Sequence, residues 1–371
     1  MYITGNITAS EYADYIYIGS FTTAKVGNID LGNDYDTVIT GYDVDATIGN
    51  VSGVGYFEIG SGVSSDDKAI VKVSDIAGTQ YDDVISVGDF MNVTIGDIDF
   101  KEGYNNIYTG YDADVTFGNI SGVGYFGVGD GVSSENEANI EAKDITGTQY
   151  DDVFAFGNYT DVEFDNLTFG EGNDYIGNGI FSEIEASGKI DFGAGYDSMF
   201  VNSFSRAEAG ALDFGADYDV LTLGYKSELI LGKNVENVEA IYADVDTKII
   251  VKDTTADVSF KGVEGTWQNA TIYDLVADTL NKGDEIIGNV YGNEWDVYKF
   301  TAAETKLRLA PDSNNVDVKL FANEGGVWTE IANDRFAFDN LTVGSEYAVM
   351  ISVDNAGYTD ETKKSYNIKI A

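Results

Sequence analysis

The sequence GTQYDDV occupies residues 78–84 and returns unchanged at residues 147–153, 69 positions later. The surrounding sequence repeats at the same offset. VSGVGYFEIGSGVSS, from Val51, returns as ISGVGYFGVGDGVSS, from Ile120, with eleven of fifteen positions identical. A repeat period of tens of residues is typical of solenoids, propellers and other arrays. We therefore expect a fold built by stacking similar units.

A shorter period of about 23 residues lies within each long repeat and is marked by glycine-rich turns. Turns such as GNDYD at Gly32 and GAGYD at Gly193 are each followed by a short alternating run that ends at glycine. A second short strand follows and ends in IGN, IGD or FGN. Two strands of period two, with no helical stretch between them, predict one coil of a parallel β-solenoid. We expect residues 1–262 to form roughly ten such coils, stacked about 4.8 Å apart.

A tyrosine accompanies almost every turn. Because equivalent positions of successive coils lie above one another, the pattern predicts a stacked tyrosine ladder that stabilises the solenoid. A sugar-binding aromatic strip is the alternative interpretation. The tyrosines concerned are Tyr35, Tyr56, Tyr81, Tyr104, Tyr125, Tyr150, Tyr196 and Tyr218.

The composition excludes several classes of function. The 371 residues include 64 acidic and 21 basic side chains, no His and no Cys, and the formal net charge is −43. Such a surface repels nucleic acid and anionic membranes. Without His or Cys the chain cannot build a Ser-His-Asp triad, a Cys-His dyad or a His-ligated metal site. No apolar stretch is long enough for a transmembrane helix, and residues 1–20 lack the features of a secretory signal.

The stretch GEGNDYI at residues 170–176 resembles the calcium-binding nonapeptide of the repeats-in-toxin family, and the turns at Gly193 and Gly215 look similar. In that family, turn carbonyls and aspartates of adjacent coils hold Ca²⁺, a hard cation that takes six or more oxygen ligands. The resemblance implies bound calcium at some of these turns, whereas the alternative is an ordinary turn role for Asp and Asn. The implied metal ligands are Asp36, Asp82, Asn105, Asp151, Asp174, Asp197 and Asp219.

Two departures from the family pattern affect this expectation. The coils here are much longer than nine residues, and the motif occupies one corner of each coil. The GVGYF turns at Gly53 and Gly122 are expected to place Phe57 and Phe126 where the aspartate belongs. The ladder of ligands should therefore be interrupted in every third coil.

After residue 262 the glycine and tyrosine rhythm stops. Residues 263–282 are expected to form a cap or linker, and residues 283–371 an antiparallel, jelly-roll-like β-sandwich, because short alternating strands recur at intervals of about eight to twelve residues. The order GDEIIGNV, DVYKF, VDVKLF and GSEYAVMISV resembles the bacterial pre-peptidase C-terminal domain. That resemblance implies an extracellular accessory domain associated with secretion, targeting or polymer binding. Trp295 and Trp328 are candidate sugar platforms, with core or rim packing as the alternative.

Together these features favour a non-catalytic, calcium-stabilised extracellular or cell-surface protein of structural or adhesin type from a bacterium, exported without a visible N-terminal signal. The expected partners are the protein itself, assembled end to end or laterally into a filament or surface layer, or an extracellular polymer. Two long loops, at residues 62–69 and 131–138, are the candidate functional elements of the solenoid surface. The alternative is a polysaccharide-processing enzyme or a carbohydrate-binding module. No Lys and Arg cluster with acids at a repeated position, as catalysis on an acidic sugar needs.

Overall fold

The computed structural model describes residues 5–32, 34–134, 136–233, 235–252, 264–266, 270–276, 285–290, 294–311, 316–324, 327–333, 336–353 and 364–370. Every regular element in these ranges is a β-strand, so none of them is a helix that could cross a membrane. Contacts divide the chain into two units, Met1–Ser227 with Val235–Tyr242 and Glu228–Asn234 with Ala243–Ala371. The parallel β-solenoid predicted from the repeat is confirmed, with about 11 turns.

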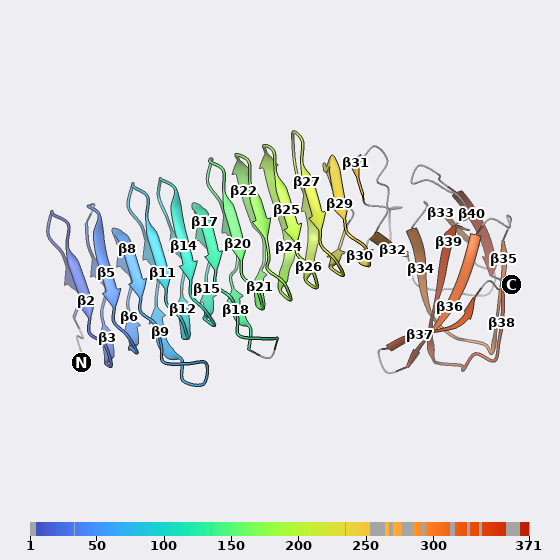
Figure 1. The fold of residues 1–371 in the computed structure, drawn as a ribbon, viewed down its shortest axis with the longest axis horizontal. Helices are drawn as coiled ribbons and strands as arrows, with labels where there is room; N and C mark the ends of the chain where they lie inside the picture. Colours follow the sequence, from blue (N-terminus) through green and yellow to red (C-terminus); the bar gives the residue numbers. More distant parts are fainter. Residues whose placement is uncertain are drawn as a thin grey trace. The chain divides into compact units, whose positions relative to one another are not determined.

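One side of the solenoid is a parallel sheet to which each coil contributes one strand (Figure 1). The strands follow the glycine-rich turns, as the sequence predicts. Within the first unit they are β2 (Tyr15–Ile18), β5 (Asp36–Thr40), β8 (Val54–Ile59), β11 (Val84–Val87), β14 (Asn105–Thr109), β17 (Val123–Val128), β20 (Val153–Phe156), β23 (Tyr175–Gly177), β25 (Ser198–Val201) and β27 (Val220–Leu223).

The opposite side carries the second predicted strand of each coil, again in parallel register. These strands are β3 (Thr23–Val26), β6 (Asp45–Ile48), β9 (Ala69–Val73), β12 (Met91–Ile95), β15 (Asp114–Phe117), β18 (Ala138–Glu141), β21 (Thr160–Phe164), β24 (Glu183–Ala194) and β26 (Arg206–Asp213).

Most coils also have a third, short strand that the sequence pattern did not predict. It follows the IGN or IGD corner, where a single inward apolar residue is enough to bring the backbone into register with the next coil; Ile76, for example, pairs with Val51 and Ile98. The short strands are β1 (Ile7–Thr8), β4 (Ile29–Asp30), β7 (Val51–Ser52), β10 (Ile76–Ala77), β13 (Ile98–Asp99), β16 (Ile120–Ser121), β19 (Ile145–Thr146) and β22 (Leu167–Glu171).

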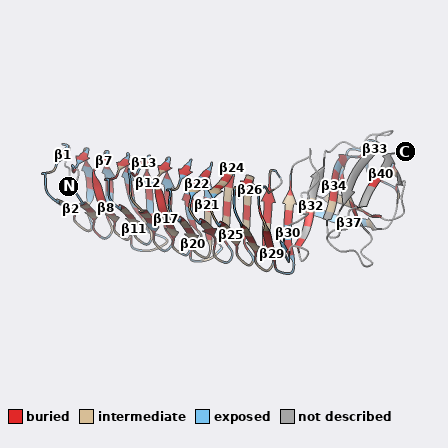
Figure 2. Cartoon of the chain, turned by 90° about the horizontal axis from the view of Figure 1, so that it is seen from above, coloured by how far each residue is buried: buried red, intermediate tan, exposed pale blue. Residues whose placement is uncertain are grey.

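The core of the solenoid is a column of alternating side chains inside the coils. In β5, for example, Asp36, Val38 and Thr40 are buried while the residues between them are partly exposed, and the same alternation of buried and exposed colours runs along the strands in Figure 2. Because the register is regular from coil to coil, apart from bulges where β5 meets β8, β14 meets β17 and β24 meets β26, each inward residue packs on its equivalents above and below. Burial of this apolar surface is the main stabilising term of the solenoid.

The prediction of one tyrosine ladder is wrong. Tyr56 is in register with Thr37 of β5, two residues after Tyr35, so the tyrosines of the GVGYF coils occupy a different position from those of the other turns. The ring of Tyr35 instead lies across Gly55, where a Cβ would come within 2.6 Å of the ring. Other rings stack instead. Inside the coils, Phe192 stacks between Phe169 and Phe214, with ring centroids 5.0 and 4.7 Å apart. On the outside, the exposed Phe181 stacks between Tyr159 and Phe204, with ring centroids 5.4 and 5.1 Å apart.

In the second unit, β28 (Glu228–Leu231), β30 (Thr247–Val251) and β32 (Ala270–Val276) pair in parallel. β32 falls within residues 263–282, the expected cap or linker, and it also pairs in parallel with β34 (Glu294–Thr301). The predicted end of the solenoid at residue 262 lies outside the described residues. β31 (Glu264–Gly265) is a further short strand of this unit.

The C-terminal strands are antiparallel, as predicted. β34 pairs with β39 (Glu346–Val353), which pairs with β36 (Val316–Glu324), which pairs with β37 (Val327–Asn333). A second sheet has the order β33 (Glu285–Val290), β40 (Lys364–Ile370), β35 (Lys306–Pro311) and β38 (Ala337–Asp339). Side chains of both sheets, among them Val318, Val349, Leu309 and Phe338, form one buried cluster. The arrangement is a β-sandwich.

Candidate metal centre

Three glycine-rich turns, at residues 170–174, 193–197 and 215–219, stack in register in consecutive coils; we call them the open turns. Gly170 pairs with Gly193, and Ala194 bridges to Ala216. Gly195 has a φ of 151°, and a Cβ there would lie 1.5 Å from the carbonyl oxygen of Gly172. Only glycine permits both this backbone conformation and this close approach. The second glycine of GAGYD therefore reflects the close approach to the turn before it; in the third turn Asp217 takes this position, with a φ of 91°.

Each open turn ends in an aspartate that begins the next strand and points into the solenoid. The carboxylate accepts the backbone N–H of the aspartate in the preceding coil: Asp174 N–H donates to Asp197 Oδ1 over 2.7 Å, and Asp197 N–H donates to Asp219 Oδ1 over 2.7 Å. Asp219 N–H continues the series to Glu239 Oε2 at 2.9 Å. These residues are buried, and each carboxylate replaces a hydrogen bond that the bent backbone cannot make at the corner.

The same buried position occurs in most other coils. Asp14 N–H donates to Asp36 Oδ1 over 2.5 Å, and Asp83 N–H donates to Asn105 Oδ1 over 2.8 Å. The Asn105 amide also donates to the Gly122 carbonyl at 2.8 Å, so both ends of this side chain are used. We call the set the buried acidic column. It comprises Asp36, Asp83, Asn105, Asp152, Asp174, Asp197 and Asp219.

Two of the predicted ligands lie outside this column. Asp82 and Asp151 are exposed, and their Oδ1 atoms accept the N–H groups of Tyr104 and Asn173, both at 2.8 Å. The next residue in each GTQYDDV copy, Asp83 or Asp152, takes the buried position. The expected equivalence of Asp82 and Asp151 with Asp36 is therefore wrong by one residue, because it was counted from the glycine of the turn; their role as metal ligands stays a prediction. Counting back in steps of two from the inward Ile85 identifies Asp83 correctly.

The expected interruption of the column is present, but different residues cause it. Val54 is in register with Asp36, and Val123 with Asn105. Phe57 and Phe126, which we expected there, lie further along the strand as fully buried core residues. An apolar residue thus takes the aspartate position in the GVGYF coils, and no carboxylate is available from them at this corner.

The turns of the two GTQYDDV copies differ from the open turns in how they use the carboxylate, and we call them closed turns (residues 78–83 and 147–152). In the first, Asp83 Oδ2 accepts Thr79 N–H and Oδ1 accepts the Thr79 hydroxyl, both at 2.7 Å. In the second, Asp152 Oδ2 accepts Thr148 N–H at 2.7 Å and Oδ1 accepts the Thr148 hydroxyl at 2.6 Å. Both oxygens therefore have partners within their own turn.

In the open turns, one carboxylate oxygen of each aspartate has no hydrogen-bond partner. The Oδ2 atoms of Asp174, Asp197 and Asp219 are buried and make no hydrogen bond, as is also true of Asp36. Burial, together with the neighbouring carboxylates of the column, raises the pKa of Asp174 to about 8 and that of Asp219 to about 7. Burial also raises the pKa of Asp197. An unpaired charge in such a place is strongly unfavourable, so the column has to be neutralised by a proton or a cation.

The open turns offer oxygen donors, the type that a hard cation takes, but the free donors are fewer than such a cation needs. Each open turn offers one unpartnered carboxylate oxygen and several backbone carbonyls, all oxygen donors of the kind that Ca²⁺ takes. Among the described residues, no three acidic side chains converge on one point. The carbonyls of Gly193 and Ala194 already accept N–H groups from Ala216 and Gly172. A calcium ion here would take the Oδ2 atom of one of Asp174, Asp197 and Asp219, or of two neighbouring ones, with carbonyls completing its shell.

A second series of acidic and amide side chains shows what a purely structural role looks like. At the IGN and IGD corners, Asp75 Oδ1 accepts Asp97 N–H at 3.0 Å, and Asp97 Oδ1 accepts Asn119 N–H at 2.8 Å. These side chains are exposed. The same bond between coils therefore forms in water without any buried charge, and it depends only on the acceptor oxygen.

Comparisons with known proteins add no functional information. No protein-family model matches the chain, and no curated protein matches it. Solved structures that it resembles include periplasmic inhibitors of g-type lysozyme from Escherichia coli (a mutant), Salmonella Typhimurium and Aeromonas hydrophila, at 15%, 16% and 12% identity. The matches cover 25%, 25% and 27% of this chain and 96%, 97% and 99% of those chains, with TM-scores of 0.21, 0.21 and 0.22.

Proposed function

We propose that this protein is a non-catalytic extracellular or cell-surface scaffold of structural or adhesin type, in which a calcium-stabilised acidic solenoid displays loops. The observation that carries the proposal is the use of the corner side chains. In coil after coil they accept backbone N–H groups from the neighbouring coil, through the buried acidic column and through the exposed series at Asp75, Asp97 and Asn119. Side chains engaged in this way stiffen the stack.

The displayed elements are two loops, residues 62–69 and 131–138, that extend beyond the same edge of the solenoid (Figure 1). Each is closed by a short antiparallel bridge, between Ser64 and Asp67 or between Ser133 and Asn136. Their bases differ. Lys68 of the first loop forms ion pairs with Asp112 and Asp114 at 3.0 and 2.8 Å.

At the base of the second loop, Glu137 replaces Lys68 as the equivalent residue. Burial and the nearby Asp161 raise the pKa of this carboxyl. The first loop is thus held to the coils by the ion pairs of Lys68, which Glu137, an acidic residue, cannot form with aspartates. The duplication has kept the geometry of the loops and changed their charge, as suits surfaces that contact different partners.

The calcium part of the proposal is supported by the unpartnered oxygens of the open turns and by the resemblance of their sequence to calcium-binding repeats. Millimolar Ca²⁺ outside cells would neutralise these carboxylates and couple folding to export. A net charge of −43 favours a partner other than nucleic acid, either a second copy of the chain or an extracellular polymer.

Thermal unfolding followed by circular dichroism tests this function. We expect millimolar CaCl₂ to raise the midpoint over that in excess EDTA, and MgCl₂ at equal ionic strength to have a much smaller effect. Asp197→Asn should reduce the calcium response, because an amide bonds as Asn105 does and carries no charge. Asp97→Asn, in the exposed series, is the matched control and should leave the response intact. A midpoint that is the same in EDTA and CaCl₂ would remove calcium from the proposal.

A further inference from the structure

The outer face of the mixed sheet in the second unit carries an apolar groove that the sandwich core does not use. In β34, Tyr298 and Phe300 point into the core, so the alternate residues Val297 and Lys299 lie on the other face. Met350 of β39 and Phe321 of β36 lie on that face by the same alternation. The groove has a volume of about 430 Å³.

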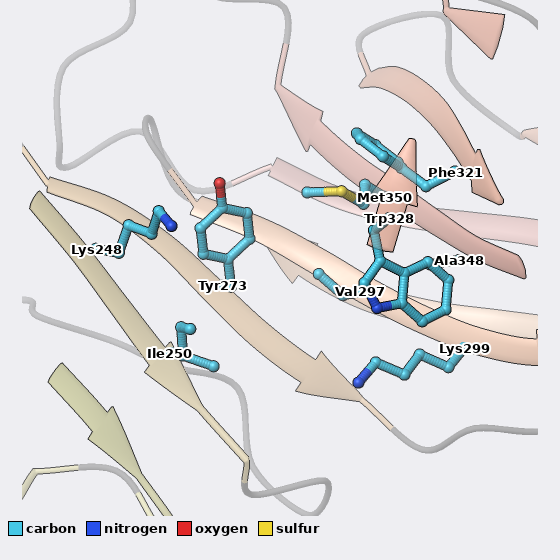
Figure 3. Close-up of a pocket in the computed structure, with 9 residues that line it drawn as sticks. All are labelled: Lys248, Ile250, Tyr273, Val297, Lys299, Phe321, Trp328, Ala348 and Met350. Carbon is cyan, nitrogen blue, oxygen red and sulfur yellow. The ribbon is translucent and has the colours of Figure 1, made fainter. Parts of the chain in front are cut away.

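The parallel strands extend the same groove. Ile250 of β30 is in register with Tyr273 of β32, and both line it. Figure 3 shows Lys248 beside Tyr273 at one end and Lys299 beside the indole of Trp328 at the other. Trp328 is 37% exposed, so much of its ring is available to a ligand. The groove therefore has an aromatic and aliphatic floor with an ammonium group at each end.

A second pocket of about 390 Å³ adjoins the first and shares Lys299 and Trp328 with it. Its other lining residues include Thr301, Asn323 and Glu346, and the Asn323 amide donates to Glu346 at 2.8 Å. Hydroxyl, amide and carboxylate groups thus line the second pocket, whereas the first pocket is lined mostly by apolar and aromatic side chains. Lys299 Nζ is held 5.7 Å from the centre of the indole ring by a cation–π interaction.

We propose that this groove binds an acidic oligosaccharide, one that contains hexuronic acid. A sugar ring presents an apolar C–H face, which packs on an exposed indole, and hydroxyl groups, which pair with amide and carboxylate side chains. The carboxylate of a uronic acid would pair with Lys299 or Lys248 in a charge-assisted hydrogen bond. Lys319, which lies 4.8 Å from the ring centre of Trp295, is on the same face and is paired with Glu330 at 3.5 Å.

Charge complementarity selects this ligand over a neutral sugar. Three lysines lie on this face; Lys248 pairs with Glu228 and Lys319 with Glu330, both at 3.5 Å, so the charge offered to a ligand is chiefly that of Lys299, which forms no ion pair among the described residues. The inference goes beyond the proposed scaffold role and gives it a ligand class. It depends on none of the residues of the buried acidic column, so either proposal can fail while the other stands.

Isothermal titration calorimetry of the full chain with tri-galacturonic acid, at fixed Ca²⁺, tests the proposal. We expect saturable binding that Trp328→Ala weakens by about tenfold or more. Lys299→Gln should weaken binding of the acidic trisaccharide by about tenfold and leave that of the neutral galactose trisaccharide almost unchanged. Lys306→Gln, an exposed lysine of the second sheet, is the matched control and should have no effect. Circular dichroism checks that each variant is folded.

Several outcomes would overturn the assignment. One is no binding by the folded wild-type chain, and another is an equal loss of affinity in Lys299→Gln and Lys306→Gln. Equal affinity for the acidic and neutral trisaccharides would remove the role of the lysines. If a hexa-glutamate peptide bound as tightly as tri-galacturonic acid, or more tightly, the groove would recognise negative charge rather than sugar. A calcium-insensitive protein that binds tri-galacturonic acid would leave this inference standing and contradict only the calcium proposal.

Discussion

The closed and open turns place an aspartate at the same buried position and treat it differently. At residues 78–83, Thr79 supplies both an N–H and a hydroxyl, and both oxygens of Asp83 have partners. At residues 193–197 the chain is shorter, glycine brings the turns together, and Asp197 keeps a buried oxygen with no partner. Burial raises the pKa in both kinds of turn, but the hydrogen bonds from Thr148 limit that of Asp152 to about 6, whereas the pKa of Asp174 is raised to about 8. At neutral pH a closed turn can therefore hold its charge, whereas an open turn needs a proton or a cation.

The largest expected effect comes from removing the glycine that makes an open turn possible. Gly195→Ala would force a Cβ to 1.5 Å from the Gly172 carbonyl oxygen at a φ of 151°, so the turns must separate. We expect a loss of about 3 kcal/mol in the free energy of unfolding, measured by urea denaturation. Gly5→Ala is the control, because its Cβ would meet nothing within 4 Å. A similar small loss in both variants would mean that the turns are not closely stacked.

The second prediction concerns pH. The pKa of Asp174 is raised to about 8 and that of Asp219 to about 7, so in this range the folded state holds protons that the unfolded state has released. Their contribution to stability is fully present below pH 4 and is lost as pH rises through 7 and 8. In EDTA, the unfolding temperature should therefore fall by on the order of 5 °C between pH 5 and pH 8.5.

The double variant Asp174→Asn/Asp219→Asn serves as the comparison for this measurement. Amides do not titrate in this range, so the variant should show a much flatter pH profile. A wild-type midpoint that rises with pH in EDTA would contradict the buried, proton-holding state of the open turns.

A smaller effect is expected from opening a closed turn. Thr148→Val removes the hydroxyl that donates to Asp152 Oδ1, and we expect a loss of about 1–2 kcal/mol in the free energy of unfolding. The variant should also gain sensitivity to calcium or pH at this turn, since Asp152 then resembles Asp197. Thr116→Val, at an exposed strand position, controls for the change of residue. The comparison fails if Thr148→Val is destabilised without any new sensitivity.

The smallest effect separates the two aspartates of GTQYDDV. Asp82→Asn should change the free energy of unfolding by less than about 0.5 kcal/mol, because an exposed amide oxygen accepts Tyr104 N–H equally well. Asn173 makes the same bond to Tyr196 N–H at 2.9 Å. Asp83→Asn should cost about 2 kcal/mol, since its amide would face Thr79 N–H. Chemical denaturation of both variants checks the assignment, and a reversed order would restore Asp82 to the buried column.

The sequence predicted the solenoid well because its evidence is redundant. Two periods, of 69 and about 23 residues, agree with the alternation of apolar residues and with the glycine turns. Five of the seven metal ligands that the sequence predicted fall in the buried acidic column, whereas Asp83 and Asp152 were missed, because two adjacent aspartates compete for one inward position. Strand alternation, counted from Ile85, would have resolved that choice. The tyrosine ladder failed for a related reason, since a shifted register in the GVGYF coils moves Tyr56 away from Tyr35.

What the sequence by itself determined is the parallel stack: short strands, glycine corners and an exact repeat leave few other ways to bury the apolar face. Only the tertiary structure decided which aspartate oxygens have partners, because in the open turns the donor to the carboxylate of Asp197 or Asp219 is a backbone N–H 22 or 23 residues away. It also decided that Trp328, Lys299 and Lys248 share a groove, since β37, β34 and β30 are brought onto one sheet by β32, β36 and β39. Contacts between distant segments depend on register and strand order, which local patterns do not record.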